Sequence, residues 1–519
     1  MDVITGKLNQ LQLAPFGQLL KLFPDARQAR IRYHAVRKTA HYRLLVEDTT
    51  ILGAIAYREQ AGHVTLISAL SWKSSDKTRL FETIMLYFSQ MRKAGVTVTM
   101  APKYRHHRGL PGFEKIGERT YQKKLTYPIA LVLGGGGAHG AFETGVFDVL
   151  KAHHIIPREI LGVSVGAINA MSFMHLDSTV AHHTWDSLTT DTVYEVPAVG
   201  PSKKTFNKTL TKHLLGRQYF EKQSLRQLIY PVVAHELATP RLAEMSLVAT
   251  EFPRLKPMVY TVTDETTADE LTDWILATSA FYPMVAPVNI NGKQYVDGGY
   301  SNNLPINVAA EHGAKEIYAV SIMDGVPENW HAPQDVKVHY IRTPWQFGPL
   351  LDFVPELSQY YMRLGEIRTL QVLGELKGYF YGLANDVDFS WLGGTQLIKW
   401  LATDVVTAPV AKLLSEAPIW VVWQKWLQGD LDPDAKDAGQ AQGLATMERL
   451  ARLMNVDEQK TYTLTSFIEA IVAVGAKHRA LLPMPTGPIS RTYLVTNPDV
   501  VLTSVLYLLS KSAKASIIY

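Results

Sequence analysis

The chain has 519 residues, of which 47% are hydrophobic and 19% are charged. This composition is typical of a globular protein and excludes a collagen-like, coiled-coil or largely disordered chain. The sequence contains no cysteine, which excludes disulfides, thiolate metal sites and a cysteine nucleophile. The first residues do not form a secretory signal, and no apolar run reaches the roughly 18 residues of a membrane span, so we expect a cytoplasmic protein.

Charge is distributed unevenly along the chain. Residues 1–127 contain 21 Lys and Arg against 9 Asp and Glu, whereas the remainder contains 31 against 39. A basic segment of this kind indicates an anionic partner. Alternatively, it only aids solubility or packs against the acidic part of the chain. No nucleic-acid-binding module accompanies it, so we expect no nucleic-acid partner.

The basic segment at residues 1–127 has the pattern of a small α/β module. Strands are predicted for four β-rich apolar runs, Tyr42–Val46, Ile51–Tyr57, Val64–Leu70 and Val96–Met100. Apolar residues at helical spacing predict a helix over Lys77–Ala94. This order loosely resembles a GNAT-type acetyltransferase, but Ser71–Asp76 replaces the glycine-rich pyrophosphate loop of that family. We therefore interpret the segment as a degenerate, non-catalytic binding or docking module.

Residues 128–343 alternate apolar strands with helices, which predicts a mostly parallel sheet covered by helices on both faces. The predicted strands are Ile129–Leu133, Ile160–Val163, Glu244–Thr250, Pro257–Val262, Gln294–Val296, Glu316–Ile322 and Val336–Ile341. The predicted helices that begin this segment are Ala138–His153 and Val165–His175.

Residues 344–519 are expected to be mainly helical. The helical stretches are Leu350–Leu376, Leu397–Trp426 and Ser466–Leu482. Gly429–Gly443 is predicted to be an exposed acidic loop between them. The large apolar residues of this region form a helical core, or alternatively line an acyl-chain channel or touch a bilayer surface.

Three motifs lie in the middle segment. The first, Gly134–Gly140, reads GGGGAHG, follows a predicted strand and opens a helix, where backbone N–H groups bind anions. Its Gly135, Gly137 and Gly140 also fit the dinucleotide pattern G-x-G-x-x-G, so a dinucleotide-binding enzyme is an alternative. That fold requires an acidic residue at the end of the second strand, where this chain has Ser164.

The second motif is Gly162-Val163-Ser164-Val165-Gly166, placed between a predicted strand and a helix. This is the pattern of a nucleophile elbow, in which a sharp turn exposes the serine hydroxyl. The third motif, Asp297-Gly298-Gly299, follows a later strand, so its carboxylate can project into a site. On its own, Asp-Gly is more often an ordinary turn.

The order of these motifs resembles the patatin-like phospholipase family. Matching residues also surround them: Ala277–Ala280, Pro283, Pro287 and Asn303–Pro305. The resemblance covers Tyr127–Ile322 and implies a three-layer α/β/α fold and a serine hydrolase of lipid acyl esters that needs no cofactor. It makes Ser164 the nucleophile and Asp297 its base. The implied oxyanion hole consists of Gly135, Gly136 and Gly137. The implied supporting positions are His139, Gly140, Gly162, Gly166, Gly298 and Gly299.

Two details of this chemistry have alternatives. Burial would raise the basicity of Asp297, but the order Ser164, Asp297, His312 also fits a catalytic triad. We expect His312 instead to interact with the C-terminus of its helix. His139 stands where the family usually has Arg or Lys. Because histidine titrates near neutrality, we expect the rate of the wild-type protein to depend more strongly on pH than the rate of His139→Arg. Alternatively, the ring only packs on the first helix turn.

The segment Ser202–Arg226 combines seven Lys and Arg with interleaved apolar side chains. It is either a flap that settles on an anionic bilayer, giving peripheral membrane association, or an amphipathic helix packed on the sheet. Adjacent histidine pairs do not suggest a metal site. A patatin-like protein that binds lipid without turnover is a second functional class. The lipid head group, acyl-chain preference and oligomeric state are not predicted.

Overall fold

The computed structural model describes residues 2–5, 41–47, 50–60, 63–71, 95–99, 114–117, 120–124, 129–194, 222–323, 333, 336–432, 437–477 and 489–516. The chain divides into two compact units, one of Met1–Ile129 with His154–Arg158 and one of Ala130–His153 with Glu159–Tyr519. The division into three domains at residues 127 and 343 stays a prediction. Within the described ranges, no helix combines the length and apolar character needed to cross a bilayer.

The described part of the first unit contains a seven-stranded sheet in the order β1-β2-β3-β4-β5-β7-β6. Its strands are β1 (Asp2–Thr5), β2 (His41–Glu47), β3 (Thr50–Gln60), β4 (His63–Ser71), β5 (Gly95–Thr99), β6 (Glu114–Lys115) and β7 (Thr120–Lys124). β4 pairs with β5 in parallel, and the other neighbouring strands of this sheet are antiparallel. The four predicted strands are confirmed. The predicted helix Lys77–Ala94 and residues 72–76 of the predicted loop lie outside the described residues.

The second unit contains an eight-stranded sheet in the order β12-β13-β10-β9-β8-β14-β15, with β11 paired to β10. Its strands are β8 (Ile129–Leu133), β9 (Glu159–Gly162), β10 (Glu244–Phe252), β11 (Lys256–Thr261), β12 (Val288–Ile290), β13 (Lys293–Val296), β14 (Glu316–Ser321) and β15 (Lys337–Arg342). All seven predicted strands are present, and the three-residue β12 was not predicted. The prediction of a mostly parallel sheet is only partly right. β8, β9 and β10 run in parallel, but β11, β12 and β13 add an antiparallel edge.

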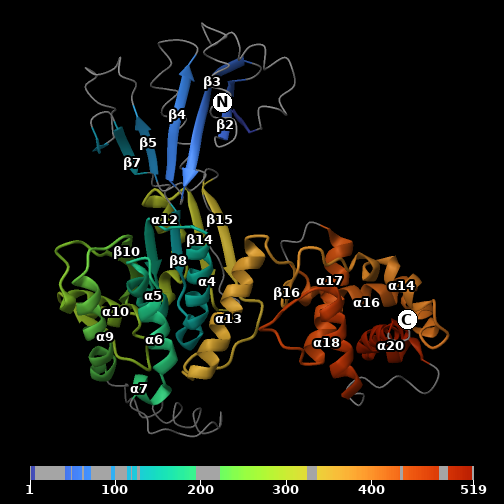
Figure 1. Ribbon diagram of the computed structural model, residues 1–519. Coiled ribbons are helices and arrows are strands. Elements are labelled where there is room, and N and C mark those ends of the chain that lie inside the picture. Colours follow the sequence, from blue (N-terminus) through green and yellow to red (C-terminus); the bar gives the residue numbers. More distant parts are fainter. Residues whose placement is uncertain are drawn as a thin grey trace, which may run out of the picture. The chain divides into compact units, whose positions relative to one another are not determined.

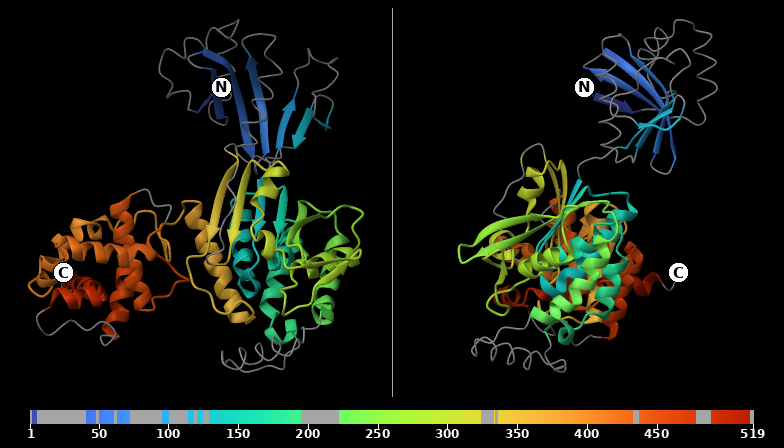
Figure 2. Two further views of the ribbon diagram at one scale, coloured as in Figure 1. Left: turned by 180° about the vertical axis from the view of Figure 1, so that it is seen from behind. Right: turned by 90° about the vertical axis from the view of Figure 1, so that its left-hand side faces the viewer.

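Helices cover this sheet. The helices before β15 are η4 (Gly137–Gly140), α4 (Ala141–Ala152), α5 (Val165–Phe173), α6 (Thr179–Ser187), α7 (Thr190–Tyr194), α9 (Lys222–Leu237), α10 (Ala268–Thr278), α11 (Gly299–Asn302) and α12 (Ile306–Glu311). Residues of α12 pack against alternate residues of β8, β9 and β14, which point to one face of the sheet. Figure 1 shows α4, α5 and α6 in front of the strands, and the view from behind in Figure 2 brings β14 and β15 to the front. The predicted helix Ala138–His153 begins as the 3-10 turn η4.

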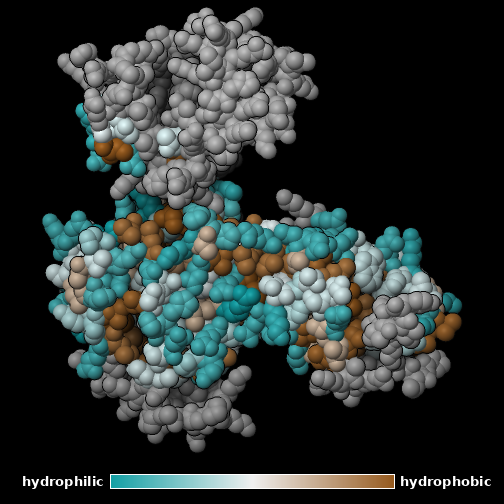
Figure 3. Space-filling view, in the orientation of Figure 1, coloured by the Kyte–Doolittle hydropathy of each residue, from teal (hydrophilic) through white to brown (hydrophobic). Residues whose placement is uncertain are grey.

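The region after β15 is helical, as predicted. It contains α13 (Pro355–Val372), η5 (Ser390–Leu392), α14 (Thr395–Leu401), α15 (Ala408–Leu414), α16 (Ala417–Leu427), η6 (Gln428–Asp430), α17 (Ala438–Leu453), α18 (Leu464–Lys477), α19 (Arg491–Thr496) and α20 (Asp499–Ser516), with short strands β16 (Gly382–Leu383) and β17 (Thr461–Tyr462). Figure 3 shows hydrophobic residues on the visible face of this region. Among its large hydrophobic side chains, that of Val405 is 88% exposed.

The prediction that Gly429–Gly443 forms an exposed acidic loop is wrong over much of that stretch. Asp430 is buried and accepts hydrogen bonds from Arg449 and Arg452, so it is not part of an exposed acidic surface. Helix α17 then begins at Ala438, because the Asp437 side chain caps it by accepting the N–H of Gln440 at 2.7 Å.

Candidate active site

Ser164 lies at a sharp turn between β9 and α5. Its φ of 54° and ψ of −124° are unusual for a residue with a side chain. A Cβ on Gly162 would lie 2.3 Å from the carbonyl oxygen of Gly166, and one on Gly166 would lie 2.5 Å from that of Leu133. Only glycine fits these two positions without movement of the backbone. The two glycines therefore allow the strand and the helix to meet at the turn that presents the serine.

Asp297 follows β13 and lies beside Ser164. Burial raises the pKa of its carboxyl to about 6, while hydrogen bonds with the Ser164 hydroxyl and the Gly299 N–H oppose this rise. The Gly299 N–H donates to Asp297 Oδ1 at 2.8 Å. A Cβ on Gly298 would lie 2.0 Å from the carbonyl oxygen of Val248, so this turn passes too close to β10 for a side chain. The environment thus makes the carboxylate a stronger base than an exposed aspartate.

The glycine loop passes next to the same serine. The Gly135 N–H donates to Asn303 Oδ1 at 3.1 Å, and Asn303 Nδ2 donates to the Gly135 carbonyl oxygen at 3.2 Å. Among the hydrogen bonds between described residues, none engages the N–H of Gly136 or Gly137, and both glycines line the cavity above Ser164. The three predicted glycines therefore differ. The N–H of Gly135 is occupied, which argues against it as an oxyanion donor, whereas the N–H groups of Gly136 and Gly137 remain available.

His139 is buried behind this loop, at the start of the first helix. Its Nδ1 lies 3.3 Å from the carbonyl oxygen of Ile322, and its Nε2 lies 2.9 Å from that of Gly348. The rings of Phe347 and Tyr361 contact it edge-on. The side chain is therefore held between two backbone carbonyls and two aromatic rings. The ring thus contacts residues far along the chain and does not merely pack on the first helix turn, and the pH effect predicted for its replacement by Arg stays a prediction.

Gly140 connects the loop to a buried polar network. A Cβ there would lie 2.5 Å from Val165 Cγ2, so a side chain would displace the start of α5. Asn169 Nδ2 donates to the Gly140 carbonyl oxygen and to Glu143 Oε2, each at 2.8 Å. Burial raises the pKa of Glu143 well above its ordinary value. Trp185 Nε1 donates to Asn169 Oδ1 at 3.1 Å, so the network extends from the loop to the cavity wall.

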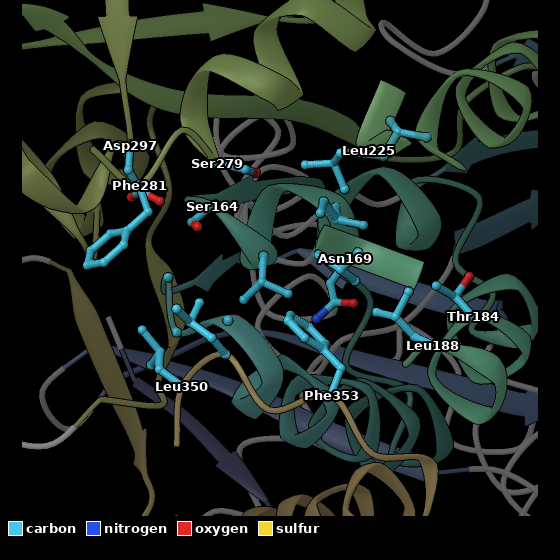
Figure 4. Close-up of a pocket in the computed structure, with 18 of the residues that line it drawn as sticks. Ser164, Asn169, Thr184, Leu188, Leu225, Ser279, Phe281, Asp297, Leu350 and Phe353 are labelled. Carbon is cyan, nitrogen blue, oxygen red and sulfur yellow. The ribbon is translucent and has the colours of Figure 1, made fainter. Parts of the chain in front are cut away.

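A cavity of about 530 Å³ contains the serine and the aspartate. In Figure 4, Ser164 and Asp297 lie toward one side and Leu188 and Thr184 toward the other. The remaining wall is mostly apolar. It includes Ile168, Met171, Val193, Leu225, Leu228, Ile229, Val232, Phe281, Met284, Leu350 and Phe353. This volume lies within the range of small-molecule sites and suits a ligand with a long apolar part.

The structure does not bring the other predicted groups to this cavity. His312 Nδ1 lies 2.6 Å from Oε1 of Glu159, the first residue of β9, whereas Ser164 lies two residues beyond the other end of that strand. His312 is the C-cap residue of α12, as its expected place at the helix C-terminus requires, and its side chain also pairs with Glu159. Of the basic–apolar segment, residues 202–221 lie outside the described residues, and Arg226 is paired with Asp269 and Asp273 on α10. No cluster of metal-binding side chains occurs among the described residues.

Two contributors to the site were not assigned roles from the sequence. Thr278 Oγ1 accepts the N–H of Ser164 at 2.9 Å, and Asn303 pairs with Gly135 as described above. Both lie in stretches that had been matched to the family, Ala277–Ala280 and Asn303–Pro305. Their presence was therefore visible in the sequence, but their contacts depend on the folded chain.

Residues 131–310 match the protein family described as patatin-like phospholipase. A lysophospholipase NTE1 of Mycosarcoma maydis is 23% identical over 49% of this chain and 13% of that protein. The human patatin-like phospholipase domain-containing protein 5 is 30% identical over 36% of this chain and 43% of that protein. The crystal structure of VipD from Legionella pneumophila aligns with 79% of this chain and 95% of its own, at 13% identity and a TM-score of 0.30. The chain thus matches the two curated relatives, from Mycosarcoma maydis and human, over less than half of their own lengths. The predicted family and fold class are confirmed for the matched region.

Proposed function

Because residues 131–310 form a patatin-like phospholipase domain, we propose that this protein hydrolyses carboxylic esters of lipids, with Ser164 as nucleophile and Asp297 as base. The observation that carries the proposal is the position of the Ser164 hydroxyl beside a buried carboxylate in an apolar cavity. A serine hydroxyl is a weak nucleophile until a neighbouring group removes its proton. The raised pKa of Asp297 makes that transfer easier.

The reaction has two halves. Ser164 Oγ bonds to the ester carbonyl carbon while its proton passes to Asp297, and the carbonyl oxygen becomes an oxyanion. The free N–H groups of Gly136 and Gly137 are the proposed donors to that oxyanion. Collapse of the intermediate expels the alcohol, which takes the proton from Asp297. Water then attacks the acyl-enzyme with Asp297 again accepting the proton. Ser164 Oγ takes this proton back as its bond to the acyl carbon breaks, and the fatty acid is released.

The proposed substrate is a phospholipid or lysophospholipid. The Mycosarcoma maydis relative is named a lysophospholipase, and the apolar wall of the cavity suits an acyl chain. The test is incubation of the purified protein with a mixed lipid extract, followed by mass spectrometry of the released acids. We expect fatty acids from wild type and none above background from Ser164→Ala. Equal release by both proteins would overturn the proposed role of Ser164.

A patatin-like protein that binds lipid without turnover is the second candidate. It is supported by the departure from the family pattern at His139, where a fixed positive charge is absent. This candidate predicts that the wild type retains lipid on vesicle flotation but releases no acid from it. Release of acid that requires Ser164 excludes it.

We also propose peripheral contact of a cytoplasmic protein with anionic membrane surfaces through the basic–apolar segment. Its five lysines are Lys203, Lys204, Lys208, Lys212 and Lys222. Basic side chains near anionic lipid each contribute on the order of 1 kcal/mol to binding. Replacement of all five by Gln is expected to reduce co-sedimentation with phosphatidylserine vesicles. Unchanged co-sedimentation would favour an amphipathic helix that packs on the protein.

A further inference from the structure

Asn303 connects two of the three motifs of the site. Its side-chain amide pairs with both the N–H and the carbonyl oxygen of Gly135, at 3.1 and 3.2 Å. A Cβ on Gly299 would meet Asn303 Oδ1 at 2.9 Å and Asp297 Oδ1 at 3.1 Å. The amide therefore lies between the glycine loop and the turn that carries the base.

This pairing occupies one N–H group of the loop and leaves those of the next two residues without an acceptor among the described residues. Glycine residues have wide conformational freedom, and the loop contains four in succession, Gly134–Gly137. The Gly135 N–H belongs to the peptide group before its Cα, and its carbonyl belongs to the peptide group that also carries the Gly136 N–H, so the two hydrogen bonds hold both peptide groups in place. With Gly135 held in this way, its N–H is occupied, and the next two N–H groups remain free beside Ser164.

We propose that Asn303 is a positioning residue that preorganises the oxyanion hole, an inference that rests on the proposed function. Its amide does not touch the reacting atoms in this scheme. It acts by holding the Gly136 and Gly137 N–H groups where the negative charge develops. Donors that are aligned before the reaction stabilise the transition state without the cost of reorganisation.

The role of Asn303 can be tested by replacing its amide with an apolar side chain that branches at the same carbon. Asn303→Leu removes both hydrogen bonds to Gly135. The matched control is Asn302→Leu, because the Asn302 amide donates to Asn307 Oδ1 at 2.9 Å and does not line the cavity. We expect kcat of Asn303→Leu to fall about 10- to 100-fold with KM nearly unchanged, a smaller loss than that for complete removal of an oxyanion donor. Asn302→Leu is expected to keep the wild-type kcat.

A long-chain trifluoromethyl ketone reports on the hole independently of turnover. Ser164 Oγ adds to its carbonyl carbon, the hydroxyl proton passes to Asp297, and the former carbonyl oxygen becomes an oxyanion in the hole. Its inhibition constant should therefore rise in Asn303→Leu by the same factor as kcat falls. If that variant does not fold, as judged by thermal unfolding, Asn303→Ser provides the same test with less steric change.

The outcomes separate this inference from the proposed function. An active wild type with Asn303 variants that match Asn302→Leu in kcat and in ketone inhibition would overturn the role of Asn303 alone. A loss confined to KM or to thermal stability would also overturn it, since it would indicate a purely structural residue. A wild type that releases no acid and does not bind the ketone would instead overturn the proposed function.

Discussion

Thr278 Oγ1 accepts the N–H of Ser164 at 2.9 Å and donates to the carbonyl oxygen of Val248 at 2.5 Å. The threonine hydroxyl thus links the serine turn to the neighbouring strand β10. Backbone conformations with positive φ at a residue other than glycine cost on the order of 1–3 kcal/mol and require support from their surroundings. This hydrogen bond is part of the support for the Ser164 conformation.

Thr278→Val is therefore expected to destabilise the protein and to lower kcat. The change keeps the side-chain shape but leaves the Ser164 N–H without its acceptor, which costs about 1–3 kcal/mol. Urea unfolding and acid release measure the two effects. Thr272→Val is the matched control, because Thr272 is buried on the same helix and donates only to its own helix at Ala268. Equal behaviour of the two variants would contradict a role for Thr278 in holding the serine.

The rate should depend on the protonation of Asp297. Its pKa of about 6 means that the carboxylate, the proposed base, forms as the pH rises through that value. We predict that kcat/KM increases about tenfold per pH unit below pH 6 and levels off above it. Asp297→Asn should remove nearly all activity, whereas the exposed Asp264→Asn should not. A profile that is flat between pH 4.5 and 7 would argue against this base.

The same carboxyl should make stability depend on pH. Its pKa is higher in the folded chain than the ordinary value of 3.8, so ionisation opposes folding. The penalty is absent below pH 3.8, grows between 3.8 and 6, and reaches about 3 kcal/mol above pH 6. Denaturant unfolding should therefore find Asp297→Asn more stable than wild type at pH 7.5, with the difference shrinking towards pH 4. A difference that does not change with pH would contradict the raised pKa.

His312→Ala separates the two-residue mechanism from a catalytic triad. The imidazole is paired with Glu159, so its removal should lower stability modestly and leave kcat within about twofold of wild type. Acid release and thermal unfolding of the same preparation distinguish the two effects. A loss of kcat by several orders of magnitude would instead favour a triad.

The sequence predicted the parts of the site that depend on local geometry. The glycines around Ser164 and after Asp297 are required by close backbone approaches, so they mark those turns directly. The roles of Thr278 and Asn303 could not be predicted, because each contacts a residue far away in the sequence. The position of His312 also depends on the whole fold, since chain order alone allows a triad.

The main errors in the predicted fold arise where the local sequence pattern is weak. β12 is too short for a pattern of alternating residues to be recognised. The start of α17 is rich in Ala, Gly and Gln, so it lacks the apolar periodicity that identifies a helix. The residue that marks the start of this helix in the sequence is the cap, Asp437. Gly443 allows the helix to approach Phe389, because a Cβ on Gly443 would lie 1.9 Å from the Phe389 carbonyl oxygen.

The central claim, that Ser164 is the activated nucleophile, is tested most directly by covalent labelling. Purified wild type, Ser164→Ala and Asp297→Asn are treated with a fluorophosphonate and analysed by intact-protein and peptide mass spectrometry. We predict one adduct per wild-type chain, mapped to Ser164, with none on Ser164→Ala and strongly slowed labelling of Asp297→Asn. An inert wild type that nevertheless releases fatty acid, or an adduct that persists in Ser164→Ala, would contradict this account.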